Sequence, residues 1–87
     1  MIYKLFIWKH EDKYILVFPE IDPGMITIGE DKQEAKIEAI VKARLALKNM
    51  QEYPPNKSIE DMYDLLNTLP EEEFISTSGV EFDKNTA

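Results

Sequence analysis

Apolar residues alternate with polar ones at the start of the chain. Residues 2–9 and 14–18 form two such runs, separated by the polar residues 10–13. Two short alternating runs joined by a polar loop are typical of a β-hairpin. Because the loop contains no glycine, we expect a four-residue type I turn rather than a two-residue primed turn. The first run carries apolar side chains on both sides, which predicts a strand that is covered on both faces, one of them only in part.

Two prolines interrupt the apolar pattern after the hairpin. Neither Pro19 nor Pro23 can donate a hydrogen bond to a neighbouring strand, so the second strand should end at Phe18. Gly24 follows Pro23, and we expect it to adopt a positive φ in a type II turn. Residues 25–28 then predict a third strand.

The middle of the chain changes to a helical pattern. Asp31 stands three residues before Glu34, the spacing of a capping box, and residues 32–50 contain neither glycine nor proline. This combination predicts a helix from residue 32 to about residue 50.

The predicted helix has two apolar sides instead of one. The first side is rich in alanine and suits close packing on a sheet: Ala35, Ala39, Ala43, Ala46, Leu47 and Met50. The second side holds Ile37, Val41 and Leu45 at intervals of four residues. A helix that covers a sheet needs a single apolar side, so the second side should meet something else. A second helix packing across it and another protein chain are both open alternatives.

The rest of the chain predicts one more helix and one more strand. Ser58 has Asp61 three residues later and should cap a helix that runs to about residue 67. Residues 74–82 predict a last strand, with Gly79 as a possible β-bulge. The order β-β-β-α-α-β predicts a single α+β domain over residues 1–87, with the helices on one face of a mostly antiparallel sheet.

The negative charge is confined to the C-terminal part of the chain. Residues 1–51 contain eight acidic and eight basic side chains, whereas residues 52–87 contain nine acidic and two basic ones, which accounts for the net charge of −7. A chain with this charge lacks the basic face that duplex DNA needs, so we expect no DNA binding by the chain alone. The acidic part would suit a basic partner, although solubility alone also explains it.

No set of side chains suggests catalysis. The chain has no cysteine and one histidine, His10, in a predicted loop. Metal-binding spacings, a nucleophile elbow and phosphate-binding glycine motifs are all lacking, so we expect no enzymatic activity, no metal and no cofactor.

The N-terminal residues are too short and too polar a stretch for a signal peptide or a membrane span, which predicts a soluble, cytoplasmic protein without membrane contact.

The stretch FPEIDPGMITIGEDKQEA, residues 18–35, resembles the HicB-type antitoxin family. That family shows a proline-framed turn, a short strand and a run T-x-G-D/E-T-x-x-E-A that opens a helix. Residues 58–61 and 80–83 also resemble segments of the family, so that the resemblance covers most of the chain. The matching positions are Phe18, Pro19, Pro23, Gly24, Thr27, Gly29, Glu34 and Ala35.

The chain departs from the family pattern in several places. Asp22 is an extra residue between the prolines, Met25 replaces a common cysteine, and Asp31 replaces the usual capping threonine. Ile37 and Val41 occupy positions that are usually charged in the family. Many members continue into a DNA-binding domain that is not seen here, so the chain is either a short member or a fragment.

The resemblance implies a degenerate ribonuclease-H-like fold without the nuclease carboxylates. It also implies a protein that binds a small basic, mRNA-cleaving toxin of the HicA type and blocks its active site. The alternative is a non-enzymatic regulatory or ligand-binding module that dimerises and shares only the fold. We expect a homodimer or higher oligomer, because a small core leaves apolar surface exposed. The candidate partner-binding residues are the acids Asp64, Glu71, Glu72 and Glu73 and the helical residues Ile37, Val41 and Leu45.

Overall fold

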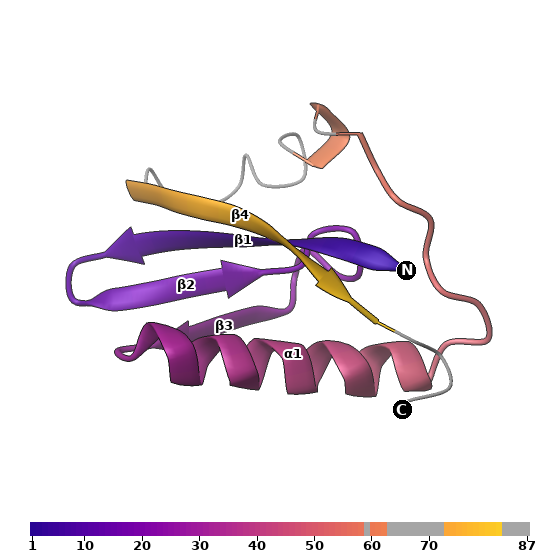
Figure 1. Cartoon of the computed structure of the whole chain (residues 1–87), viewed down its shortest axis with the longest axis horizontal. Coiled ribbons are helices and arrows are strands. Elements are labelled where there is room, and N and C mark those ends of the chain that lie inside the picture. The colour runs from indigo at the N-terminus through magenta and orange to yellow at the C-terminus, as the bar shows by residue number, and fades with distance from the viewer. Residues whose placement is uncertain (59, 63–72, 83–87) are drawn as a thin grey trace.

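A computed structural model describes residues 1–58, 60–62 and 73–82. The described residues form a four-stranded sheet in the order β3-β2-β1-β4, in which every neighbouring pair is antiparallel. One helix lies along one face of the sheet (Figure 1). The predicted α+β class is therefore confirmed, whereas the likeness to ribonuclease H stays a prediction. The elements are β1 Ile2–His10, β2 Lys13–Val17, β3 Ile26–Gly29, α1 Lys32–Lys48 and β4 Glu73–Glu81.

The β1–β2 hairpin has a tighter turn than the sequence predicted. His10 pairs with Lys13 in the ladder, so the loop between the strands contains only Glu11 and Asp12. Glu11 has a φ of 56°, which a residue with a side chain rarely adopts. The prediction of a four-residue loop was wrong because the twist of the strands favours a short primed turn even where glycine is lacking.

The segment between β2 and β3 turns without a glycine in the left-handed region. Met25 N–H donates to the carbonyl of Asp22 over 3.1 Å, and Gly24 N–H donates to the Asp22 carboxylate over 2.9 Å. No glycine among the described residues has a positive φ, so the predicted type II turn at Gly24 was wrong. The side chain of Asp22 holds the turn instead, as in an Asx-turn.

The start of α1 agrees with the predicted capping box. The Asp31 carboxylate accepts a hydrogen bond of 3.0 Å from the backbone N–H of Glu34. The helix ends at Lys48 with Asn49 as its C-cap, two residues before the predicted end. Just before the helix, a Cβ on Gly29 would lie 3.1 Å from the Cβ of Ala35, so a larger residue would push β3 away from α1.

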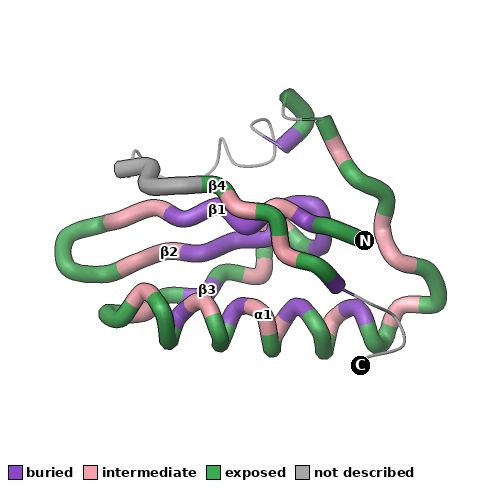
Figure 2. The backbone as a smooth tube through the Cα atoms, viewed as in Figure 1, coloured by how far each residue is buried: buried purple, intermediate pink, exposed green. Residues whose placement is uncertain are grey.

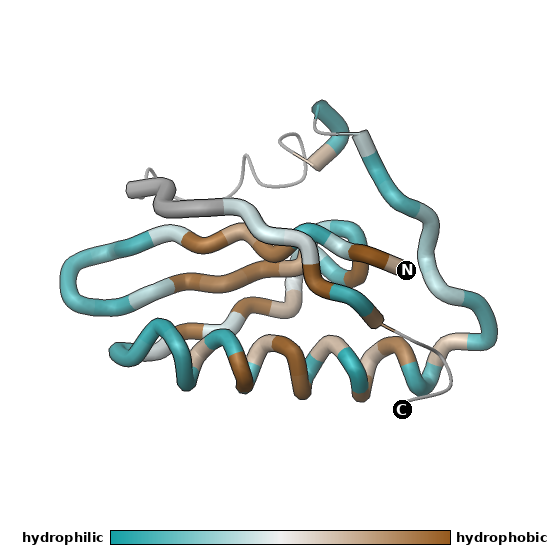
Figure 3. The backbone as a smooth tube through the Cα atoms, in the orientation of Figure 1, coloured by the Kyte–Doolittle hydropathy of each residue, from teal (hydrophilic) through white to brown (hydrophobic). Residues whose placement is uncertain are grey.

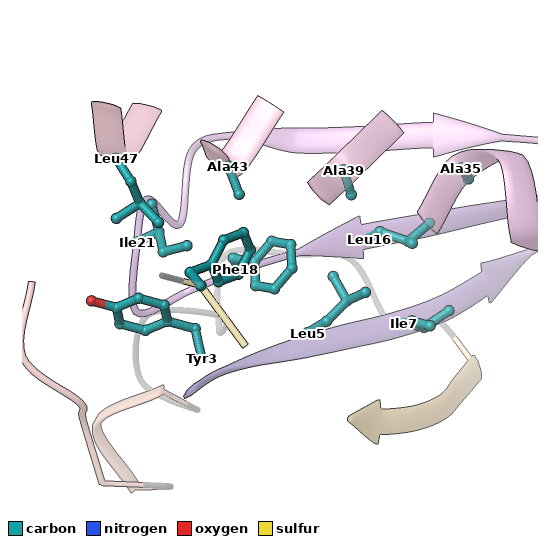
Figure 4. Packing of buried hydrophobic residues seen from close by; sticks show 11 residues of the cluster. Tyr3, Leu5, Ile7, Leu16, Phe18, Ile21, Ala35, Ala39, Ala43 and Leu47 are labelled. Carbon is teal, nitrogen blue, oxygen red and sulfur yellow. The ribbon is translucent and has the colours of Figure 1, made fainter. Parts of the chain in front are cut away.

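The main core lies between α1 and the face of the sheet that we call the inner face. Small side chains of α1 point at larger ones from β1, β2 and the turn after β2 (Figure 4). The alanines let the helix axis come close to the strands, so large strand residues fill the space between the layers. The buried members are Tyr3, Leu5, Ile7, Leu16, Phe18, Ile21, Ala35, Ala39, Ala43, Leu47 and Phe82.

A smaller core lies on the opposite face of the sheet, the outer face. Met62 is fully buried there against Phe6 and Val17, with Trp8 packed beside them. Met62 belongs to the segment in which Ser58 caps a helical turn, with the Ser58 hydroxyl accepting from Asp61 N–H over 3.2 Å. The cap is confirmed, and residues 63–67 of the predicted second helix lie outside the described residues. The expectation that both helices share one face was wrong for residues 60–62, because Met62 packs on Phe6 and Val17 on the face opposite α1.

The last strand, β4, pairs with β1 along almost its whole length. The register shifts between Ile7 and Trp8, which pair with Ser76 and Phe74, so the irregularity lies at residue 75 and not at Gly79 as predicted. Gly79 has a different role: a Cβ there would lie 2.9 Å from Cγ2 of Ile2, its close neighbour on β1.

The strained residue in the hairpin gives a first prediction. Glu11→Gly should raise the free energy of unfolding by about 1 kcal/mol, because glycine adopts a positive φ without the steric cost that a Cβ brings. The exposed contact of 3.9 Å between His10 and Glu11 is lost in this variant, and such a contact contributes little. Urea denaturation measures the difference.

The matched control for this prediction is Asp12→Gly, the neighbouring change at an ordinary φ. That variant should be no more stable than the parent, since glycine adds only unfolded-state entropy there. Equal effects of the two substitutions would contradict the account of the turn.

Candidate protein-interaction surfaces

The described residues form no pocket, and no group of three or more His, Asp or Glu side chains among them could hold a metal ion. Within the same residues, no helix is both long and apolar enough to span a membrane. The candidate sites among the described residues are therefore parts of the exposed surface.

A buried carboxylate shapes one end of the sheet. β2 stops at Val17, so the first residues of β1 have no strand beside them on that side. The side chain of Glu20 takes that place: it is 3% exposed, and its Oε1 accepts from Lys4 N–H over 2.8 Å. Its Oε2 accepts from Asn56 Nδ2 over 2.8 Å and from Lys57 N–H over 3.0 Å. Three donors thus satisfy a carboxylate whose burial would otherwise be costly.

The same contacts fix residues 53–57 against β1. Asn56 Nδ2 also donates to the carbonyl of Ile2 over 2.8 Å, and the Tyr3 hydroxyl donates to the carbonyl of Pro54 over 2.6 Å. Burial, then the negative charge of Glu20 and the neighbouring Tyr53, raise the pKa of the Tyr3 phenol. Tyr3 therefore keeps its proton and remains a hydrogen-bond donor well above neutral pH.

Sequence reasoning missed Glu20 and Asn56. Glu20 looked like one more polar residue in a proline-rich turn, and Asn56 like part of a loop. The only signal was local: Glu20 lies among the apolar residues Phe18 and Ile21, where a solvated carboxylate is unusual.

The second apolar side of α1 is exposed. Ile37 is 64%, Val41 48% and Leu45 58% exposed, and we call these three residues the helix stripe. Figures 2 and 3 show α1 with its buried side toward the sheet and hydrophobic positions on its outer side as well. The described residues of the second helical segment contact the outer face of the sheet, so the alternative in which that segment covers the stripe is wrong for them.

A second exposed apolar surface lies on the outer face of the sheet. Trp8, Ile15 and Ile28 stand opposite one another in neighbouring strands, where Trp8 and Ile15 are half-buried and Trp8 packs beside the Met62 cluster. Ile28 is 58% and Ile26 is 36% exposed on the edge strand β3. We call Trp8, Ile15, Ile26 and Ile28 the outer-face patch.

The candidate acidic residues are only partly placed. Glu73 begins β4, where its backbone pairs with that of Lys9. Asp64, Glu71 and Glu72 lie outside the described residues. The structure thus brings the three residues of the helix stripe together, and it does not place the acidic set relative to them.

No protein-family model, no curated protein and no solved structure matches the chain.

The buried carboxylate gives a second prediction. Glu20→Gln should lower the free energy of unfolding by about 1–3 kcal/mol, because the amide nitrogen would face a group that also donates. Chemical denaturation followed by circular dichroism measures the loss.

Asp22→Asn is the matched control, because it removes the same charge from an exposed residue and keeps an oxygen that can accept from Gly24. This variant should unfold within about 0.5 kcal/mol of the parent. If the two variants lose the same stability, Glu20 does not have the role described here.

The raised pKa of Tyr3 gives a third prediction. A group whose pKa is higher in the folded state than in the unfolded state stabilises the fold less as the pH rises past its unfolded pKa. For Tyr3 the unfolded pKa is the ordinary tyrosine value of 10.0. Tyr3→Phe should be less stable than the parent at pH 8, since the bond to Pro54 is lost. The difference should shrink above pH 10 because only the parent has this phenol to ionise.

Denaturation curves from pH 8 to 11 test this expectation, with Tyr14→Phe as a control that removes a tyrosine hydroxyl elsewhere in the fold. A constant difference between the parent and Tyr3→Phe over the whole range would contradict it.

Proposed function

We propose that the chain is an antitoxin that binds a small basic, mRNA-cleaving toxin of the HicA type and covers its active site. The motif over residues 18–35 supports the proposal, and so does an element order, β-β-β-α-β, that agrees with the resemblance. The protein would inhibit by occupying a surface, without chemistry of its own.

One observation carries the proposal: two acids from the acidic part of the chain, Glu60 and Asp61, lie beside Met62, which packs on the outer face of the sheet. Met62 is buried on that face, while its neighbours Glu60 and Asp61 are exposed. A basic partner that approached this side would find acidic groups beside the apolar outer-face patch. This combination of an apolar centre and a charged surround is typical of protein–protein interfaces.

The proposed mechanism follows from the chemistry of the partner. A toxin that cleaves mRNA must attract phosphate groups, so its active face should be basic. We propose that Asp64, Glu71, Glu72 and Glu73 lie where the phosphates would bind. Charges of this kind mainly raise the association rate and make it dependent on salt, whereas apolar contacts mainly slow dissociation. The helix stripe is the competing site for the toxin.

The alternative class is a regulatory module that dimerises and binds no toxin. The exposed helix stripe favours it, because a surface of this kind suits association between copies. The two classes differ in one simple observation: an antitoxin should copurify with the product of a small basic reading frame next to its own.

Charge reversal gives a fourth prediction. The triple variant Glu71→Lys, Glu72→Lys, Glu73→Lys should bind that toxin at least about tenfold more slowly at low salt and show a weaker salt dependence. Surface plasmon resonance at several salt concentrations measures both quantities.

The matched control reverses three exposed acids of the N-terminal half, Glu11, Asp12 and Glu30, and so makes the same change in net charge. It should have a clearly smaller effect on the association rate. If the triple variant binds as the parent does, with the same salt dependence, the acidic residues are not the toxin-binding site and the helix stripe becomes the better candidate.

A further inference from the structure

On the solvent side of α1, the residues are arranged symmetrically about one position, so that residues equally far from it are either both apolar or oppositely charged. That position is Val41. At three residues from Val41 the pattern has Glu38 on one side and Arg44 on the other, and at four residues it has Ile37 and Leu45. At seven residues it has Glu34 and Lys48. Each apolar residue is thus mirrored by an apolar residue, and each acid by a base.

These residues share one narrow strip of the helix surface. At 3.6 residues per turn, Glu34, Ile37, Val41, Leu45 and Lys48 fall within about 80° of one another, with Glu38 and Arg44 at the two sides. All seven are exposed, and the buried residues of α1 lie on the opposite side of the helix. Figure 1 shows α1 at the lower side of the molecule, with β1, β2 and β4 above it in this view.

From this pattern we propose that the helix stripe is a self-association surface, on which α1 of a second copy packs antiparallel, with Val41 at the two-fold axis. In that arrangement each residue meets the one that lies equally far from Val41 on the other side. Ile37 then contacts the partner's Leu45, and Glu34 faces the partner's Lys48. A two-fold axis makes each of these contacts twice.

The pattern favours antiparallel over parallel packing of the two helices, and it favours a second copy of this chain over a basic protein as the partner. In a parallel pair, Glu34 would face the partner's Glu34, and Lys48 the partner's Lys48, so like charges would repel at both ends. Residues 1–51, which include α1, have no net charge, so the net charge of −7 lies in the other part of the chain. A basic partner would gain nothing at a strip that has two acids and two bases.

The contact should be weak and dependent on concentration. The strip from Glu34 to Lys48 is about 21 Å long, which limits the buried area to the range of transient interfaces. Among the described residues, one ion pair within α1 would compete with the contacts between the two copies: the exposed pair of 3.6 Å between Glu38 and Lys42. Such a pair contributes little and can rearrange. The surface is separate from the outer-face patch, so this inference does not depend on the proposed antitoxin function.

Sedimentation velocity of the full chain over a range of concentrations tests the inference. The parent should shift from monomer to dimer, and Val41→Asp should raise the dissociation constant at least about tenfold, because it places two carboxylates together at the axis. Ile28→Asp is the matched control, because Ile28 is as exposed as Leu45 but lies on β3. The dissociation constant of the Ile28→Asp dimer should equal that of the parent. Circular dichroism verifies that each variant keeps its helix.

A charge swap tests the direction of packing. Glu34→Lys alone and Lys48→Glu alone should each weaken the dimer about tenfold, whereas the double variant should restore it to within about threefold, since the pair is only exchanged. A parent that stays monomeric up to millimolar concentration would overturn the inference. So would a dimer that Ile28→Asp disrupts and Val41→Asp does not, or one that the double charge swap fails to restore.

Discussion

The interaction on which the rest of the structure depends is the buried carboxylate of Glu20. β2 ends at Val17, shortly before Pro19, which cannot donate to a neighbouring strand, so the first half of β1 has no strand partner on that side. Glu20 then turns back and accepts the hydrogen bonds that a strand would have accepted, from Lys4 and from residues 56 and 57. A single side chain joins β1, the turn after β2 and the segment after α1. Without it, the backbone N–H groups of Lys4 and Lys57 and the side-chain amide of Asn56 would lose this acceptor, and each lost hydrogen bond would cost free energy.

This junction also decides where the chain goes after α1. Residues 53–57 are held along β1 by Glu20, Tyr3 and Ile2, and the chain then continues to the outer face, where Met62 packs on Phe6 and Val17. The helix stripe is left exposed as a consequence. The protein therefore presents two separate apolar surfaces, one on α1 with balanced charge and one on the outer face next to the acidic part of the chain. Two surfaces of different charge suit two different partners, a second copy and a basic protein.

The sequence predicted those features that depend on neighbouring residues and on periodicity. The alternation in residues 2–9 and 14–18, the Asp31 cap and the alanine side of α1 led to the observed strands, helix and inner core. One failure came from contacts between distant residues. The face of the sheet that Met62 covers depends on the path of residues 53–57, and that path depends on Glu20, which is 36 residues away from Asn56. Two turn predictions failed for local reasons: the twist of the strands favours a short turn at Glu11, and the Asp22 side chain holds the turn at Gly24 without a positive φ.

The candidate surfaces were predictable to a similar extent. Ile37, Val41 and Leu45 stood out from the sequence because one helix rarely needs two apolar sides, and all three are exposed. The outer-face patch was harder to foresee, since its row of Trp8, Ile15 and Ile28 forms only once the register of three strands is known.

Amide hydrogen exchange of the unmodified protein tests the central role of Glu20 most directly. The N–H groups of Lys4 and Lys57 have no strand partner on the side of Glu20, so their protection reports on the carboxylate itself. Both should exchange at least about a hundredfold more slowly than the N–H of Asp12 at the exposed hairpin turn. Exchange of Lys4 and Lys57 as fast as that of Asp12 would show that Glu20 does not hold these segments together, and it would contradict the account.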